Sequence, residues 1–202
     1  MERQRIVVLD MEGVVVPEIW IAVAERTGID ALRRTTRDEP DYDVLMRYRL
    51  DLLAEHGLTM SLISEVIAGL DPLPGARAFL DELRARHPVV LLSDTFEQFA
   101  APLAPPLGLP VILCHRLEVD PVTDRITGYH LRMPDQKRAA VEAFRTLAYE
   151  VRAAGDSYND TSMLLAADSG YLFRAPPNVV AEFPQLEALD AYDDLLVRLT
   201  DA

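Results

Sequence analysis

Residues 6–15 read Ile6-Val7-Val8-Leu9-Asp10-Met11-Glu12-Gly13-Val14-Val15, and this stretch decides the fold class. Its unbroken run of β-branched and apolar residues is typical of a strand that is buried on both faces of a parallel sheet. The run ends at two carboxylates on alternate positions, Asp10 and Glu12, followed by Gly13. Because open α/β sheets bind their ligands at the carboxyl ends of the strands, the stretch predicts a functional site at Asp10.

Further apolar runs of strand length recur along the chain and alternate with segments of helical periodicity. This alternation predicts an α/β fold with a doubly wound, mainly parallel, Rossmann-like sheet, and a small β-hairpin over residues 117–131. The predicted strands are Ile6–Leu9, Val89–Leu92, Val111–Leu113, Val151–Ala154 and Gly170–Phe173, and the predicted helices between them are Ala76–Arg86, Gln136–Leu147 and Asp160–Ala167.

The span from about residue 14 to residue 73 has no convincing strand pattern and contains three amphipathic segments. We expect these segments, Pro17–Gly28, Tyr42–His56 and Met60–Leu70, to be helices. A helical insert directly after the first strand predicts a cap domain, residues 14–73, above a core domain of residues 1–13 and 74–202. Such a cap is able to close over a bound substrate and exclude water.

The 202 residues carry a formal net charge of −13. This acidic balance argues against nucleic acid as a partner, because duplex binding requires a basic surface. The single cysteine, Cys114, excludes a disulfide within the chain, and neither a secretory signal nor a membrane-spanning stretch is expected. We therefore expect a cytoplasmic protein that acts on small molecules away from membranes. A homodimer is compatible with the sequence, which does not determine the oligomeric state.

The two acids after the first strand are candidates for covalent catalysis. Asp10 is the candidate nucleophile, because a carboxylate can attack phosphorus and form an aspartyl-phosphate. Taken alone, an Asp at a strand end is more often a turn or capping residue. Glu12 points to the same side as Asp10 in an extended chain and is able to act as general acid and base, although it could equally be a solvated loop acid.

Ser93 follows the second predicted strand, where it is expected to bind a phosphate oxygen at the start of the next helix. A capping box of Thr95 with Gln98 is the alternative account of part of this segment. Lys137 lies in the first turn of a predicted helix, where a cation opposes the helix dipole. Neutralising a phosphoryl group would explain this position of Lys137, and a surface lysine explains it equally well.

Asp156 and Asp160 lie four residues apart, after another predicted strand and at the start of a helix. Such sparse carboxylates suit Mg²⁺, which completes its coordination with phosphate and water oxygens. Acids near a helix start often interact only with the helix dipole. Because three strand ends carry complementary groups, we favour a Mg²⁺-dependent phosphoryl-transfer site.

Arg49 stands out in the segment Leu45–Leu53, because on a helical wheel it falls within the apolar face, whereas Arg47 and Asp51 fall opposite. A buried guanidinium needs a partner. A substrate carboxylate bound in a bidentate manner would be one, and an internal salt bridge is the alternative.

The segments Asp10-Met11-Glu12, Ser93, Lys137 and Gly155-Asp156-x-x-x-Asp160 resemble, in order and spacing, the four motifs of the haloacid dehalogenase superfamily of phosphatases. The helical insert resembles that of phosphoserine phosphatases. Among phosphoserine phosphatases, the bifunctional type also transfers the phosphoryl group to homoserine, and nearly the whole chain is similar to that type. The stretches that carry this second resemblance are Val16–Trp20, Pro40–Met46, Ser93–Phe96 and Ala153–Asp160.

The resemblance implies that Asp10 is the nucleophile, Glu12 the acid and base, and Lys137 a catalytic phosphate ligand. It also implies a Mg²⁺ site formed by Asp10, the Glu12 backbone carbonyl and Asp156, with Asp160 supporting the water shell of the metal. The superfamily usually has Asp where this chain has Glu12. The longer side chain would favour activation of a bound alcohol over that of water, because small misplacements are costly in catalysis.

For the substrate, the resemblance implies that Ser93 binds phosphate, that Asn159 contacts the phosphoryl group or the substrate, and that Asp94 belongs to the same binding set. It also assigns Arg49 to a substrate carboxylate and Glu18 to a substrate ammonium group. An acid and an Arg in the cap suit an amino-acid zwitterion.

The sequence therefore predicts a Mg²⁺-dependent phosphatase for O-phospho-L-serine, working through an aspartyl-phosphate on Asp10, with transfer to L-homoserine as a second activity. One alternative is a phosphatase for another small phosphomonoester. An alternative of a different class is a slow-turnover signalling module that accepts phosphate on Asp. Receiver domains of that class carry their acceptor on a later strand and lack a helical insert of this size.

Overall fold

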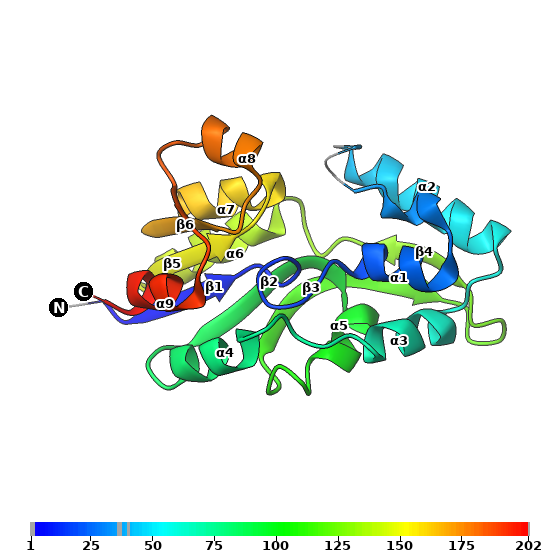
Figure 1. Ribbon diagram of the computed structural model, residues 1–202, viewed down its shortest axis with the longest axis horizontal. Coiled ribbons are helices and arrows are strands. Elements are labelled where there is room, and N and C mark those ends of the chain that lie inside the picture. Colours follow the sequence, from blue (N-terminus) through cyan, green and yellow to red (C-terminus); the bar gives the residue numbers. More distant parts are fainter. Residues whose placement is uncertain (1–2, 36–37, 40, 202) are drawn as a thin grey trace.

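The computed structural model describes residues 3–35, 38–39 and 41–201. In this part of the chain, a seven-stranded sheet has the spatial order β4-β3-β2-β1-β5-β6-β7 (Figure 1). Every neighbouring pair of strands is parallel except β3 and β4, which are antiparallel. The strands are β1 (Arg5–Leu9), β2 (Val89–Phe96), β3 (Val111–Val119), β4 (Ile126–His130), β5 (Glu150–Gly155), β6 (Ser169–Phe173) and β7 (Glu187–Leu189).

Helices cover both faces of this sheet (Figure 1). Because successive side chains of a strand point to opposite faces, β1 sends Val7 and Leu9 into one apolar cluster and Ile6 and Val8 into another. Helices α6, α7 and α8 pack on the second cluster, and the other helices pack on the first. The helices are α1 (Ile19–Thr27), α2 (Tyr42–Glu55), α3 (Met60–Ala68), α4 (Ala76–Arg84), α5 (Glu97–Leu103), α6 (Gln136–Thr146), α7 (Thr161–Ala166), α8 (Pro177–Glu182) and α9 (Tyr192–Thr200), with the 3₁₀ turns η1 (Asp30–Arg33) and η2 (Tyr158–Asp160).

The doubly wound topology fixes where the functional groups meet. β2 and β3 lie on one side of β1, whereas β5, β6 and β7 lie on the other, so the strand order reverses at β1. A reversal of this kind opens a crevice at the carboxyl ends of the two central strands. Asp10 follows β1 and Asp156 follows β5, and the N–H of Asp10 donates to the carbonyl of Ala154 at 2.9 Å. The topology thus brings two acids that are distant in sequence to one edge of the sheet.

The segment between β1 and α4 is helical, as predicted. Its described residues form α1, η1, α2 and α3, together with an isolated bridge between Glu12 and Val16. Local chemistry explains the helix ends: the side chain of Asp41 accepts from the N–H of Val44 at the start of α2, and α1 ends at Gly28 with a φ of 73°. Pro40, which belongs to one of the resembling stretches, lies outside the described residues. The division into a cap and a core domain stays a prediction.

The predicted hairpin is confirmed, but its first arm is not a separate strand. β3 is one continuous strand that pairs with β2 in its first part and with β4 in its second part. β7 and α8 were not predicted, because their short apolar patterns do not distinguish strand from helix, and α9 was not predicted either. Among the described helices, none has the combined length and apolarity needed to cross a membrane.

Candidate active site

A bulge in β2 shapes one wall of the site. Leu92 pairs with Leu113 and Phe96 pairs with His115, so three residues of β2 lie opposite a single residue of β3. Bulges of this kind bend a strand and re-aim side chains, and they are common next to active sites. The three bulged residues are Ser93, Asp94 and Thr95, and all three line the central cavity.

The prediction that Ser93 lies at a helix start is wrong. β2 continues to Phe96, and α5 begins only after it. The hydroxyl of Ser93 accepts a hydrogen bond from the N–H of Thr95 at 3.2 Å. The alternative capping box of Thr95 with Gln98 is also wrong, because the Gln98 amide bonds to both backbone groups of Leu117 instead. Ser93 therefore reaches the cavity from a bulged strand.

Lys137 is the centre of a buried network of charges. It lies in the first turn of α6, as predicted, and its Nζ is 2.8 Å from Oδ1 of Asp10, 2.7 Å from Oδ1 of Asp160 and 3.3 Å from Oδ2 of Asp94. Burial opposes the ammonium form, but these carboxylates raise the pKa of Lys137 well above its usual value. Lys137 is therefore a buried cation and not a surface lysine.

Three buried acids converge beside Lys137. Asp10, Asp156 and Asp160 each offer one carboxylate oxygen, and these oxygens lie within 4.8 Å of one another. Burial, together with Asp160 and Asp156, raises the pKa of Asp10 well above its usual value, whereas Lys137 lowers it. Three carboxylates beside one ammonium leave an excess of negative charge that a divalent cation would offset. A donor set made only of carboxylate oxygens fits Mg²⁺.

Asp160 holds the turn after β5 in place. Its Oδ2 accepts from the N–H of Asp156 at 3.0 Å and from the N–H of Ser157 at 3.1 Å, while its Oδ1 accepts from Lys137. A side chain on Gly155 would collide with Asp160. Both oxygens of Asp160 are thus engaged within the protein, which suits a supporting role.

Gly13 is required at its position for two reasons. Its φ is +78°, and a side chain there would collide with the carboxylate of Asp156. The first motif and the Asp156 motif are therefore packed directly against each other.

Glu12 lines the same cavity and contacts the start of α1. Its Oε2 accepts from the N–H of Ile19 at 2.9 Å, so the solvated loop acid considered above is excluded. Burial, with a smaller effect of the neighbouring Glu18, raises the pKa of Glu12 to about 7. A carboxyl group with this pKa is able both to give and to take a proton near neutral pH.

Arg49 is buried on the apolar stripe of α2, as the helical wheel predicts. Its Nη2 donates to the carbonyl of Arg34 at 2.9 Å, and its guanidinium carbon lies 4.5 Å from the centre of the Trp20 ring. Within the described part of the chain, its Nε has no hydrogen-bond partner and its guanidinium forms no ion pair. Burial lowers the pKa of Arg49 to about 10, so it stays charged at neutral pH. The internal salt bridge considered above is absent from the described residues.

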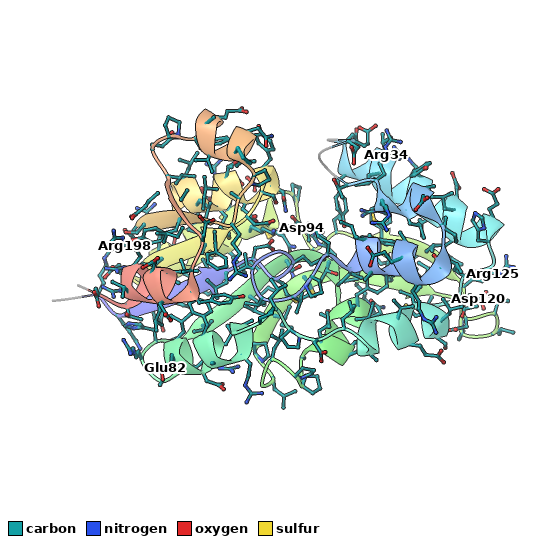
Figure 2. All side chains as sticks on the ribbon, in the orientation of Figure 1. Arg34, Glu82, Asp94, Asp120, Arg125 and Arg198 are labelled. Carbon is teal, nitrogen blue, oxygen red and sulfur yellow. The ribbon has the colours of Figure 1, made fainter. Side chains whose placement is uncertain are left out.

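One cavity brings the predicted residues together. Figure 2 shows Asp94 in the middle of the molecule, between α6 and α7 on one side and α1 and α2 on the other. Of the ten predicted site residues, nine line this cavity, and Asp160 is buried beside Lys137. The nine are Asp10, Glu12, Glu18, Arg49, Ser93, Asp94, Lys137, Asp156 and Asn159.

Five other residues line the cavity that sequence reasoning did not assign: Trp20, Thr35, Tyr42, Thr95 and Ser157. From the sequence alone, Trp20 and Tyr42 fit a cap pocket and core packing equally well. Thr95 and Ser157 lie within the motif segments, so their position beside Ser93 and Asp156 was a usable signal. Thr35 follows η1 in a segment without any recognisable pattern.

Comparisons with known proteins show the family and the fold of this chain. Residues 13–165 match the model of the haloacid dehalogenase-like hydrolase family. The chain is 61% identical, over 93% of its length and 91% of the relative, to phosphoserine phosphatase ThrH of Pseudomonas aeruginosa. It is 59% identical, over 93% of its length and 78% of the relative, to a phosphoserine phosphatase of Pseudomonas syringae pv. tomato. A solved phospho-aspartyl intermediate analogue of phosphoserine phosphatase shares the fold, with a TM-score of 0.79 at 20% identity over 98% of this chain and 99% of that one.

Proposed function

Because this chain belongs to the haloacid dehalogenase-like hydrolase family and is a phosphatase of that family, we propose that it hydrolyses O-phospho-L-serine. Family membership confirms the resemblance read from the four motifs. Two relatives with 61% and 59% identity carry the name phosphoserine phosphatase, which supports this substrate. The observation that carries the proposal is one cavity lined both by the Lys137–Asp10 pair and by Arg49.

In the first step, a carboxylate oxygen of Asp10 attacks phosphorus and forms the aspartyl-phosphate. The bond between phosphorus and the serine oxygen breaks, and Glu12 gives its proton to that oxygen. Ser93 and Lys137 bind the phosphoryl oxygens. Lys137 lies in position for this task, because its Nζ already contacts Asp10 at 2.8 Å.

In the second step, Glu12 takes a proton from water, and the water oxygen attacks phosphorus. The bond to Asp10 breaks, which releases inorganic phosphate and restores the carboxylate. Asp10, Asp156 and the backbone carbonyl of Glu12 would hold Mg²⁺, which offsets the charge of the phosphoryl oxygens when it is bound.

Arg49 supplies the specificity in this proposal. Its guanidinium is buried and charged, and its Nε has no partner among the described residues, so a substrate carboxylate would complete its hydrogen bonds. Glu18 lines the same cavity and would bind the substrate ammonium. Asn159 and Asp94 are joined by a hydrogen bond of 2.9 Å and would border the phosphoryl group.

We propose transfer of the phosphoryl group to L-homoserine as a second activity. Its hydroxyl would take the place of water in the second step, with Glu12 accepting the proton. The presence of Glu12 where the superfamily usually has Asp supports this activity. A cytoplasmic setting and a homodimer remain predictions.

Residues 14–73 would act as the cap that excludes water during both steps. One contact supports this role: the hydroxyl of Tyr42, at the start of α2, donates to the backbone carbonyl of Asp94 at 2.8 Å. α2 is thereby attached to the bulged strand at the cavity.

Phosphorus NMR tests the proposed function directly. The enzyme is incubated with O-phospho-L-serine and Mg²⁺, with and without L-homoserine. Free phosphate in the first tube, and a new phosphohomoserine signal in the second, are expected. Phosphate without phosphohomoserine would contradict the transfer activity alone. No change in either tube would contradict the substrate, and other small phosphomonoesters would then be tried.

A further inference from the structure

Asp94 connects the phosphate-binding lysine to a buried polar cluster that the mechanism above does not use. Its Oδ2 lies 2.9 Å from Nδ2 of Asn159 and 3.3 Å from Nζ of Lys137. Its Oδ1 lies 3.3 Å from Nε2 of Gln136 and 3.6 Å from Nε2 of His115. Both oxygens of this carboxylate therefore face donors from β3, α6 and the turn after β5.

His115 is held by contacts on both ring nitrogens. The backbone N–H of Arg132 donates to Nδ1 of His115 at 3.1 Å, so we assign the ring proton to Nε2, which also lies 3.3 Å from Nε2 of Gln136. That proton faces Asp94. The ring is buried, and it packs against the rings of Tyr42 and Phe96, with centroids 6.1 Å and 6.3 Å away. Packing and the Arg132 hydrogen bond together fix the orientation of His115.

The bulge in β2 explains why these groups meet. Because β2 has three residues where β3 has one, Asp94 lies on the bulge and lines the cavity, while His115 pairs with Phe96 at the end of the bulge. Gln136 is buried at the start of α6, and its Nε2 also donates to the carbonyl of Ser93 at 2.5 Å. His115 and Gln136 thus contact Oδ1 of Asp94, whereas Asn159 and Lys137 contact Oδ2.

We propose that His115 is a positioning residue for the phosphatase reaction, acting through Asp94 on Lys137. The Nζ of Lys137 is held by Asp10 and Asp160 at 2.8 and 2.7 Å, and its contact with Asp94 is the longest of the three. A phosphoryl oxygen would replace this longest contact. The contacts of Asp94 with His115 and Gln136 keep its carboxylate from moving closer to Lys137, so the ammonium group stays accessible. Without these contacts, Asp94 would approach Lys137 and compete with the phosphoryl group. This inference rests on the proposed role of Lys137 as a phosphate ligand.

The test is a double-mutant cycle with a conservative control. His115→Phe keeps the volume of the ring and removes both nitrogens, whereas His115→Gln retains a donor near the position of Nε2. The cycle combines His115→Phe with Asp94→Ala. Kinetics are measured with O-phospho-L-serine and with p-nitrophenyl phosphate, so that the result does not depend on the proposed substrate.

We expect His115→Phe to raise KM about tenfold with little change in kcat. His115→Gln should have a KM close to that of the wild type. In the Asp94→Ala background, His115→Phe should raise KM by less than about twofold. The inference would be overturned if His115→Phe raised KM equally in both backgrounds, or if His115→Phe and His115→Gln raised KM equally. If thermal unfolding shows that His115→Phe does not fold, Gln136→Met removes the second donor and is expected to raise KM in the same way; an unchanged KM would overturn the inference.

Lys137→Met separates this inference from the proposed function. If that variant keeps its activity, the phosphate-ligand role of Lys137 fails, and the inference fails with it. If that variant is inactive and the cycle is additive, the inference about His115 fails alone.

Discussion

The Nζ of Lys137 lies 2.8 Å from Oδ1 of Asp10, and both side chains are buried at the carboxyl edge of the sheet. The pair joins α6 to the end of β1, two elements that are far apart in the sequence. The contact aligns the proposed nucleophile and supplies the positive potential that an acidic chain must provide for an anionic substrate.

Replacing Lys137 by Met is expected to lower kcat/KM about 10³-fold, because it removes a preorganised cation from the phosphoryl group. It should also lower the free energy of unfolding by about 3–5 kcal/mol, since buried carboxylates lose their partner. Steady-state kinetics and chemical denaturation in the presence of a chelator measure the two effects.

Asp10→Asn/Lys137→Met is the control for that prediction. Removing the charge of Asp10 together with that of Lys137 should recover part of the stability but none of the activity. A double variant that is less stable than Lys137→Met would show that the pair is not the reason for the loss.

The acid cluster predicts a stabilising effect of Mg²⁺. Asp10, Asp156 and Asp160 lie close together in the folded protein and repel one another, so Mg²⁺ is expected to bind the folded state. By mass action, free Mg²⁺ at a hundred times its Kd should stabilise the fold by about 2.7 kcal/mol. Asp156→Asn should raise the stability of the metal-free protein and remove the response to Mg²⁺. Thermal unfolding with and without the metal tests this, and Asp51→Asn, an exposed acid on α2, serves as the matched control. Equal responses of the two variants would contradict the assignment.

Arg49 and Arg47 lie on opposite faces of α2, and only Arg49 is buried. We expect Arg49→Met to raise KM for O-phospho-L-serine about a hundredfold, through the loss of charge-assisted hydrogen bonds to the substrate carboxylate. Turnover of p-nitrophenyl phosphate, which lacks that carboxylate, should change little. Arg47→Met should leave both substrates unaffected. A parallel loss with both substrates in Arg49→Met would indicate a structural role instead.

Shortening Glu12 to Asp is expected to raise the ratio of hydrolysis to transfer. The shorter carboxyl would retreat from the N–H of Ile19, which it now contacts at 2.9 Å, and would have the length that the superfamily usually has at this position. The measurement is the ratio of free phosphate to phosphohomoserine in the presence of L-homoserine. An unchanged or lower ratio would argue that Glu12 does not set the choice of acceptor.

Cys114 should react slowly with thiol reagents in the folded protein. Burial, with a smaller effect of Glu97, raises the pKa of this thiol to about 11, so little of the reactive thiolate exists at neutral pH. The rate of modification should rise about tenfold for each pH unit between 7 and 10 and increase sharply in denaturant. A fast rate at pH 7 in the native protein would contradict the buried position of Cys114.

Most of the fold could be predicted from the sequence, because each long element has a clear apolar period. The buried strand 6–9 and the amphipathic helices 42–55 and 136–146 are examples, and their bounds agree to within about two residues. β7 and α8 could not be predicted, since three and six residues carry too little periodicity, and α9 was not predicted either. The continuity of β3 was missed because its second part exchanges a parallel partner for an antiparallel one.

Asp10, Lys137 and Asp156 could be predicted as site residues, because each lies at the end of a predicted strand or at the start of a predicted helix. Arg49 was predictable for another reason, since a charge within an apolar stripe is conspicuous. His115 gave no such signal. Its contact with Asp94 depends on the register of β2 and β3 and on a bulge, and neither feature is readable from one strand alone.

The central claim is that Asp10 carries the phosphoryl group between donor and acceptor. Wild-type enzyme is mixed with O-phospho-L-serine and Mg²⁺, quenched in acid within milliseconds and digested for mass spectrometry. We expect one phosphoryl group on the peptide that contains Asp10, and none on that peptide from Asp10→Asn enzyme. Phosphorylation of another residue, or turnover of phosphoserine by Asp10→Asn enzyme, would contradict this claim.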